Sequence, residues 1–235
     1  MQWLEAFWTK EGKGIPKDAP KKTGLALIAD ILRREGWELV KLNLLFLLAS
    51  LPLVTLPAAL FGMAHVCRLI VEDRNVYLMR DFLEAMRAHA LRASLWALVT
   101  LGAISAGTYA IITYGTYARD ALIYTLPLTV CLVATVFAAV VSSYFVMVSV
   151  AGRGSIRTAL GPAALAALLH PLPMLGALTV IALLWLAHIL FYPVSVFMPA
   201  MVNFSFGMFA VAFGAHGAVA QVLAPSGEAL QDREI

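Results

Sequence analysis

The sequence has few charged residues, and none of them lies inside its long apolar runs. Only 13% of its 235 residues are charged, whereas 61% are hydrophobic. A soluble domain usually has about 25% charged residues. The uncharged runs cover residues 42–67, 93–118, 121–152 and 158–227. This composition predicts several membrane spans, because one span needs about 20 apolar residues.

Several other features are missing, and each absence excludes a class of protein. Strict alternation of polar and apolar residues is absent, which argues against a transmembrane β-barrel. Helices satisfy their backbone hydrogen bonds within one segment, so we expect an all-α polytopic membrane protein. The two cysteines, Cys67 and Cys131, are too few for a disulfide framework, and we expect free thiols. The first long apolar run starts too late for a cleaved signal peptide, and a net charge of +3 does not indicate nucleic-acid binding.

Motifs for common catalytic and cofactor sites are absent as well. The sequence has no phosphate-binding Gly-Lys-Ser or Gly-Lys-Thr, no G-x-S-x-G elbow and no H-E-x-x-H pair. Its histidines and cysteines do not have metal-ligand spacing. No acidic or basic residue lies deep in a span, where an ion-coupled carrier needs one. We therefore expect a protein without enzymatic activity, cofactor or metal.

The segment 39–71 decides the predicted topology, because Pro52 and Pro57 interrupt it. It forms either one kinked span or a helical hairpin that turns between the two prolines. The hairpin places 16 of the 17 Lys and Arg residues on one side: 8 before residue 42, 5 in residues 67–92, 2 in 152–158 and 1 in the tail. A single span divides them almost equally, so the positive-inside rule favours the hairpin. Its arms are short, and a re-entrant hairpin satisfies the same rule.

The whole chain then divides into three parts, with both termini in the cytoplasm. Residues 1–38 form a cytoplasmic tail with a basic linker at 12–22 and an amphipathic helix marked by Leu25, Ile28 and Leu32. That helix lies either on the membrane surface or against the rest of the protein. Residues 39–222 form the transmembrane domain with about six membrane segments, and residues 223–235 form a cytoplasmic tail. After the hairpin, the spans are expected at 93–117, 121–150, 171–191 and 194–220, with a charged cytoplasmic helix at 74–92.

A few polar residues within the apolar runs need hydrogen-bonding partners. Thr55, between the two prolines, is expected to cap a freed backbone group at the turn. Asn43 and Asn203 form either interhelical hydrogen bonds or part of a polar cavity. The histidines within the apolar runs are expected either to be buried and hydrogen-bonded or, together with Asn203, to form a polar path. The residues of this predicted path are His65, His188, Asn203 and His216.

Small residues recur at intervals of four in two of the predicted spans. Ala103 and Gly107 share one face, and Ala210, Gly214 and Ala218 share another. Such faces let helices approach closely. They favour packing within the chain over packing against a second copy, although a homo-oligomer is compatible with the same pattern.

The order of several motifs resembles the YesL-like family of bacterial integral membrane proteins, whose domain has no assigned function. The resemblance covers residues 14–98: Gly14-Ile15-Pro16-Lys17-Asp18 precedes Lys41-Leu42-Asn43, then Leu51-Pro52-Leu53-Val54-Thr55-Leu56-Pro57, then Arg80-Asp81-Phe82. The positions that carry it are Asn43, Pro52, Thr55, Pro57, Arg80, Asp81 and Phe82. These are marks of the family, and their role is open to a purely structural explanation.

The resemblance implies a place in the bacterial cytoplasmic (inner) membrane and a link to carbohydrate uptake. The function expected on this basis is a non-enzymatic accessory subunit of a carbohydrate ABC importer. Its partners would be the lipid bilayer and a permease or ATPase subunit that contacts residues 74–92. The alternatives are an autonomous small-solute channel or facilitator, and an envelope-glycan assembly factor.

Overall fold

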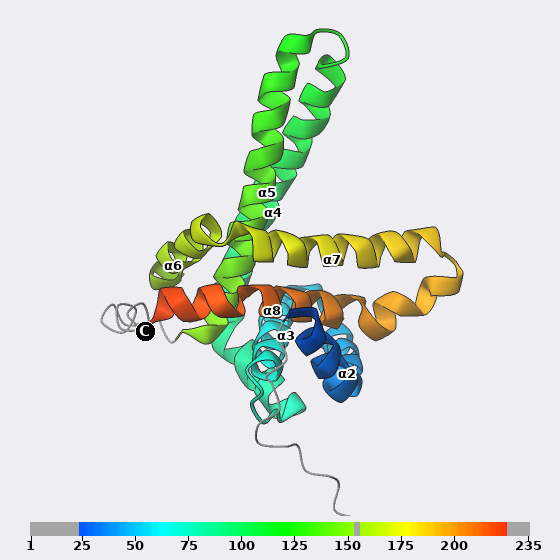
Figure 1. Cartoon of the computed structure of the whole chain (residues 1–235), viewed down its shortest axis with the longest axis vertical. Coiled ribbons are helices and arrows are strands. Elements are labelled where there is room, and N and C mark those ends of the chain that lie inside the picture. Colours follow the sequence, from blue (N-terminus) through cyan, green and yellow to red (C-terminus); the bar gives the residue numbers. More distant parts are fainter. Residues whose placement is uncertain (1–23, 153–155, 225–235) are drawn as a thin grey trace, which may run out of the picture. The chain divides into compact units, whose positions relative to one another are not determined.

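The computed structural model describes residues 24–152 and 156–224 (Figure 1). The chain divides into two units between Arg34 and Glu35, and each is described by itself. Of the first unit, residues 24–34 are helical, as predicted from Leu25, Ile28 and Leu32. The predicted basic linker at 12–22 and most of the C-terminal tail lie outside the described residues.

All regular structure in the described residues is helical, which confirms the predicted all-α class. The main helices are α2 (Gly24–Ala49), α3 (Leu56–Val71), α4 (Leu78–Tyr117), α5 (Thr125–Ala151), α6 (Ile156–Leu169), α7 (Pro171–Leu190) and α8 (Phe204–Leu223).

Five helical segments in the described part of the chain are long and apolar enough to cross a membrane. They are Leu53–Val71, Leu78–Tyr117, Leu122–Ala151, Pro171–Leu190 and Val194–Leu223. The expected sixth segment, the first arm of the hairpin, is the second half of α2. It does not qualify because five charged residues lie between Arg33 and Lys41.

The helix breaks between the two prolines, as the hairpin prediction requires. α2 ends at Ala49, a short 3₁₀ turn covers Leu53–Thr55, and α3 follows with Pro57 in its first turn. Proline suits that position because the first N–H groups of a helix have no partner within the helix. The Thr55 hydroxyl donates to the carbonyls of Ala49 and Pro52, so it pairs with backbone groups at the turn as predicted, but it makes no side-chain cap bond to the N–H groups that begin α3.

α3 lies at the centre of the packed part of the second unit. It contacts α4, α5 and α8, and ten of its sixteen residues are buried, all of them apolar or glycine. Phe61 is fully buried and its ring lies edge-on to Trp96 of α4, with 5.6 Å between centroids. A Cβ at Gly62 would stand 2.9 Å from the backbone oxygen of Phe82, so glycine permits the close contact of α3 with α4.

Two helix pairs account for the remaining spans: α4 lies beside α5, and α7 lies beside α8 (Figure 1). Gly107 of α4 faces Thr135 of α5, and Gly214 of α8 faces the backbone of Pro173 in α7. These contacts confirm that the two small-residue faces pack within the chain. Large apolar side chains of α4 such as Leu98 and Val99 remain exposed, as lipid-facing residues do in a membrane helix.

The helix boundaries differ from the predictions in two places. The charged segment 74–92 is not a separate helix, because α4 runs from Leu78 to Tyr117 without a break. Nothing in the sequence between Ala90 and Ala97 stops a helix, since neither proline nor glycine occurs there. The last span, Val194–Leu223, is not one regular helix, because a 3₁₀ turn at Val194–Val196 and a π-helical turn at Pro199–Asn203 precede α8.

Candidate functional site

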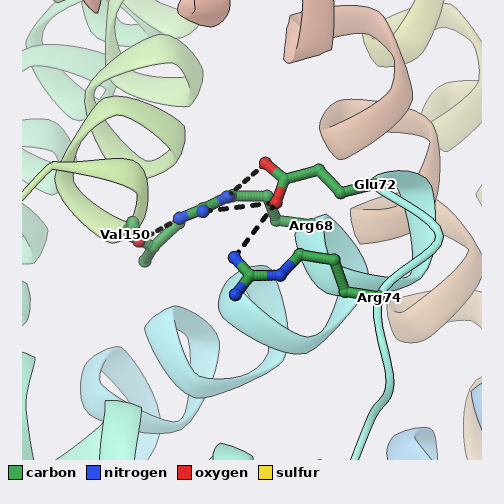
Figure 2. A network of polar contacts seen from close by, with 4 residues as sticks. All are labelled: Arg68, Glu72, Arg74 and Val150. Carbon is green, nitrogen blue, oxygen red and sulfur yellow. Dashed lines mark hydrogen bonds and ion pairs between the residues drawn. The ribbon is translucent and has the colours of Figure 1, made fainter.

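A network of charged side chains joins the end of α3 to the end of α5 (Figure 2). Arg68 donates from Nε and Nη2 to the two carboxylate oxygens of Glu72, at 2.7 and 3.3 Å. Its Nη1 donates to the carbonyl oxygen of Val150 at 2.6 Å. Arg74 adds a longer ion pair to Glu72, with 3.7 Å between nitrogen and oxygen. Arg68 therefore links two helix ends that are distant in sequence.

The C-terminus of α5 is capped by arginines from two other helices. Val150 accepts a hydrogen bond from Arg68 of α3, and Ser149 accepts one from Nη1 of Arg92 of α4 at 3.2 Å. The last carbonyls of a helix have no partner within it, and the helix dipole makes that end partly negative. Both arginines therefore have a structural role that is independent of any ligand.

The Glu72 carboxylate completes this network as the counter-ion. Burial alone would raise its pKa, but the hydrogen bonds and charge of Arg68, with the charges of Arg74 and His216, hold that pKa below its usual range. The carboxylate is therefore ionised at neutral pH, and it keeps Arg68 aligned with the end of α5.

A polar cavity of about 630 Å³ lies beside Arg68, between α3, α4 and the end of α5. This size is within the range of small-ligand sites. Its ionisable lining residues are His65 and Arg68 from α3, and Asp81, Glu84, His89 and Arg92 from α4.

Two histidines that line the cavity leave the same ring nitrogen without a partner. The Nδ1 atoms of His65 and His89 are buried and have no hydrogen-bond partner in the described structure. A proton on Nδ1 would be a buried donor without an acceptor, which is costly. Each neutral ring therefore carries its proton on Nε2, and the His65 ring is hydrogen-bonded to the backbone of Val150.

A second, smaller hollow of about 210 Å³ also borders Arg68. Glu72 and, from α8, His216 line it, together with apolar residues of α5 and α8. Arg68 and Ala151 line both hollows. The two predicted histidines His65 and His216 thus line two different hollows that share one arginine.

Asn43 forms interhelical hydrogen bonds, which is one of its two predicted roles. Its side-chain nitrogen donates to the carbonyls of Pro199 and Ala200, at 3.0 and 2.7 Å. Its side-chain oxygen accepts from the backbone N–H groups of Phe204 and Ser205, at 3.1 and 3.0 Å. A π-helical turn interrupts the ordinary backbone pairing there, and the Asn43 amide occupies the freed groups.

The other members of the predicted polar path lie elsewhere. Asn203 is fully buried in the π-helical turn, and neither polar atom of its side chain has a partner in the described structure. His188 lies at the end of α7, where its Nδ1 is 2.9 Å from the carbonyl oxygen of Ser195. The structure therefore places His65 and His216 at two hollows that share Arg68, and Asn203 and His188 at other locations, so a path through all four stays a prediction.

The family-motif residues of α4 stabilise its first turn. The Asp81 carboxylate accepts from the backbone N–H of Tyr77 at 2.8 Å, and the Asp81 N–H donates to the Tyr77 carbonyl. This reciprocal pair resembles a capping box. Arg80 pairs with Asp81 at 3.1 Å and lies over the Tyr77 ring. Phe82 is fully buried against Gly62.

The sequence alone does not reveal most of the polar cavity. It singles out Asp81 and His65 for other reasons, whereas Glu84, His89 and Arg92 enter only as part of the charged helix predicted at 74–92. The available signal was their spacing, since residues 81, 85, 88, 89 and 92 share one side of a helix. The sequence alone could not show that α3 and the end of α5 pack against that side.

Comparison with known families gives one match, to a family described as "Protein of unknown function, DUF624", over residues 39–116. The match covers the second part of α2, all of α3 and nearly all of α4, and so includes Asn43 and both helices that supply the charged wall of the cavity. Neither the curated proteins nor the solved structures contain a match to this chain.

Proposed function

We propose that the chain is a non-enzymatic accessory subunit that acts with a carbohydrate ABC importer in a bacterial cytoplasmic membrane. The motifs between residues 14 and 98 support this proposal through their resemblance to the YesL-like family. That resemblance supplies the link to carbohydrate uptake, and the geometry of α4 supplies a surface for a partner.

The observation that carries the proposal is an apolar stripe on the first turns of α4, formed by Met79, Leu83, Met86 and Ala90. α4 packs on α3 with a neighbouring face, centred on Phe82 and Ala85. The stripe is left partly or largely open, and Met79 is 60% exposed. Methionine-rich surfaces adapt to the shape of a partner.

Charged residues border the α4 stripe and would make its contacts selective. Arg80 and Arg87 are exposed along one edge. Interfaces commonly combine an apolar centre with a charged rim, and the rim excludes wrong partners more than it adds affinity. A permease or ATPase subunit with an acidic edge would fit this surface.

Site-specific photo-crosslinking in the native host tests the proposal. A photoreactive residue at Met79 should form an adduct with a permease or ATPase subunit when cells grow on an oligosaccharide that induces the importer. Leu122 is the matched control, since it is 82% exposed but lies in the turn before α5. A tagged protein that forms no adduct at residue 79 and repeatedly purifies alone from induced cells would contradict the proposal.

A further inference from the structure

The polar cavity is followed along the same side of α4 by an apolar hollow. Glu84 and Arg92 line the cavity, and Leu95, Val99 and Ala103 line the hollow. These residues follow one another at intervals of three, four or eight, so they lie in one row on the helix. The two hollows therefore succeed each other along one edge of α4.

The apolar hollow has a volume of about 470 Å³ and lies between α4, α5 and the first turns of α6. Its few polar groups bond to one another: the Thr100 and Ser142 hydroxyls are 3.0 Å apart, and Trp96 Nε1 donates to the Ser142 carbonyl at 3.3 Å. An occupant therefore meets mainly hydrocarbon side chains. If the hollow stayed empty, its lining would lose dispersion contacts.

The boundary between the two hollows coincides with the point where charge stops along α4. Arg92 is the last charged residue before the turn at 118–121, and Leu95 begins the apolar row. Leu95 follows Arg92 by three positions, a rise of only about 4.5 Å along the helix. An occupant that fills both hollows must be polar at one end and apolar at the other, as a membrane lipid is.

The charged residues of the cavity indicate which charged groups the polar end of the occupant carries. Two arginines, Arg68 and Arg92, face two carboxylates, Asp81 and Glu84. With neutral imidazoles the set has no net charge. Arg68 and Asp81 also pair with Glu72 and Arg80, and Arg92 also donates to the carbonyl of Ser149. A head with both a phosphate and an ammonium group suits such a wall better than a purely anionic head.

We propose that the polar cavity and the apolar hollow together bind one phospholipid with a zwitterionic head. Its phosphate accepts hydrogen bonds from Arg92 and from Nε2–H of His89. Its ammonium group lies at the exposed Glu84 carboxylate, and one acyl chain follows the row from Leu95 to Ala103. This assignment is independent of the importer partnership.

Native mass spectrometry of the full chain in mild detergent tests the head preference. Phosphatidylethanolamine and phosphatidylglycerol with identical acyl chains are added in equal amounts. The wild type should retain phosphatidylethanolamine about tenfold better, the effect of roughly one charge-assisted hydrogen bond. Glu84→Gln should remove that preference. Asp120→Asn, in the turn between α4 and α5, removes a carboxylate far along the chain and should leave the preference unchanged.

Two variants at neighbouring positions of α4 test the acyl-chain site. Val99→Trp fills the apolar hollow and should weaken phosphatidylethanolamine retention about tenfold. Leu101→Trp adds the same ring nearby, on a side of α4 that does not line the hollow, and should have no effect; both positions are largely exposed. Ala103→Phe is a second variant that fills the hollow, for use if Val99→Trp lowers the melting temperature.

Three results would overturn the proposal. Equal retention of the two lipids by the wild type would show that the protein has no site that prefers a zwitterionic head. Equal effects of Val99→Trp and Leu101→Trp would show that the retained lipid belongs to the general lipid layer around the protein and does not occupy the hollow. Displacement of the lipid by an equal concentration of phosphoethanolamine would show that the head alone binds, as a free solute, without the acyl-chain hollow.

Discussion

At the scale of single residues, Asn43 and Asn203 differ in partners although both are fully buried. The Asn43 side chain uses both its nitrogen and its oxygen in hydrogen bonds to the backbone between Pro199 and Ser205. The polar atoms of the Asn203 side chain have no partner in the described structure. A buried amide contributes to stability only when its hydrogen bonds are made.

Replacing each asparagine by leucine should therefore have different effects on the free energy of unfolding. Asn43→Leu leaves two carbonyls and two N–H groups unpaired, and should lower the free energy of unfolding by about 2–4 kcal/mol. Asn203→Leu removes only unpaired groups and should change it by less than about 1 kcal/mol, or raise it. Unfolding in mixed detergent micelles measures both. A large loss of stability in Asn203→Leu would show that this amide has a partner after all.

The residue types were readable from the sequence, but their partners were not. Asparagine in an apolar run predicts a hydrogen bond, and Thr55 between two prolines predicts a cap, because each group needs a partner that the helix does not supply. The Asn43 partners are 156 to 162 residues away. No local pattern identifies a backbone group at that distance.

At the scale of elements, the closest approach of α3 to α4 depends on Gly62. Gly62→Ala would place a Cβ 2.9 Å from the Phe82 backbone oxygen and 3.2 Å from its ring. Backbone cannot move aside as a flexible side chain can, so the two helices must separate. We expect Gly62→Ala to lower the free energy of unfolding by about 1–3 kcal/mol.

Gly102 of α4 is the matched control for this substitution. A Cβ there meets nothing within 4 Å. Gly102→Ala should leave stability unchanged or raise it by up to about 1 kcal/mol, because alanine favours the helix. The same micelle unfolding assay compares the two. If both variants behave alike, the α3–α4 contact does not limit stability.

Element type was easier to predict than element boundaries. Long uncharged runs give helices, and the prolines at 52 and 57 give the break between α2 and α3. The sequence pattern predicts two helices where the structure has the single helix Leu78–Tyr117, because the change from charged to apolar residues resembles a boundary. A change of environment along a helix alters its side chains, whereas ending it requires proline, glycine or a cap.

At the scale of the whole chain, the charge distribution and the helix order point to the same orientation. The end of α3, the start of α4 and the end of α5 come together at the Arg68 network and the polar cavity. Five of the arginines, at positions 68 to 92, belong to this end. The turn at 118–121 joins the other ends of α4 and α5 and contains a single one, Arg119.

This orientation predicts which side of the membrane each end occupies. Arg87→Cys, in the charged part of α4, should react with a membrane-impermeant maleimide only after cells are opened. Asp120→Cys, in the α4–α5 turn, should react in intact spheroplasts. The background carries Cys131→Ala and keeps Cys67, which is buried. Labelling of residue 87 from outside, with residue 120 protected, would reverse the topology.

The same assay decides between a full and a re-entrant hairpin, which share one charge distribution. Leu53 lies in the turn between α2 and α3 and is 79% exposed. The 16 residues of α3 rise about 24 Å, less than the roughly 30 Å of hydrocarbon in a bilayer. A hairpin that crosses must therefore thin the bilayer locally, and Leu53→Cys would then react in intact spheroplasts at a rate near that of Asp120→Cys. Because α3 is buried among α4, α5 and α8, neighbouring helices shield it from lipid, and its short length costs less than in an isolated span. We therefore expect Leu53→Cys to react from outside, and protection of this cysteine while Asp120→Cys reacts would establish the re-entrant form.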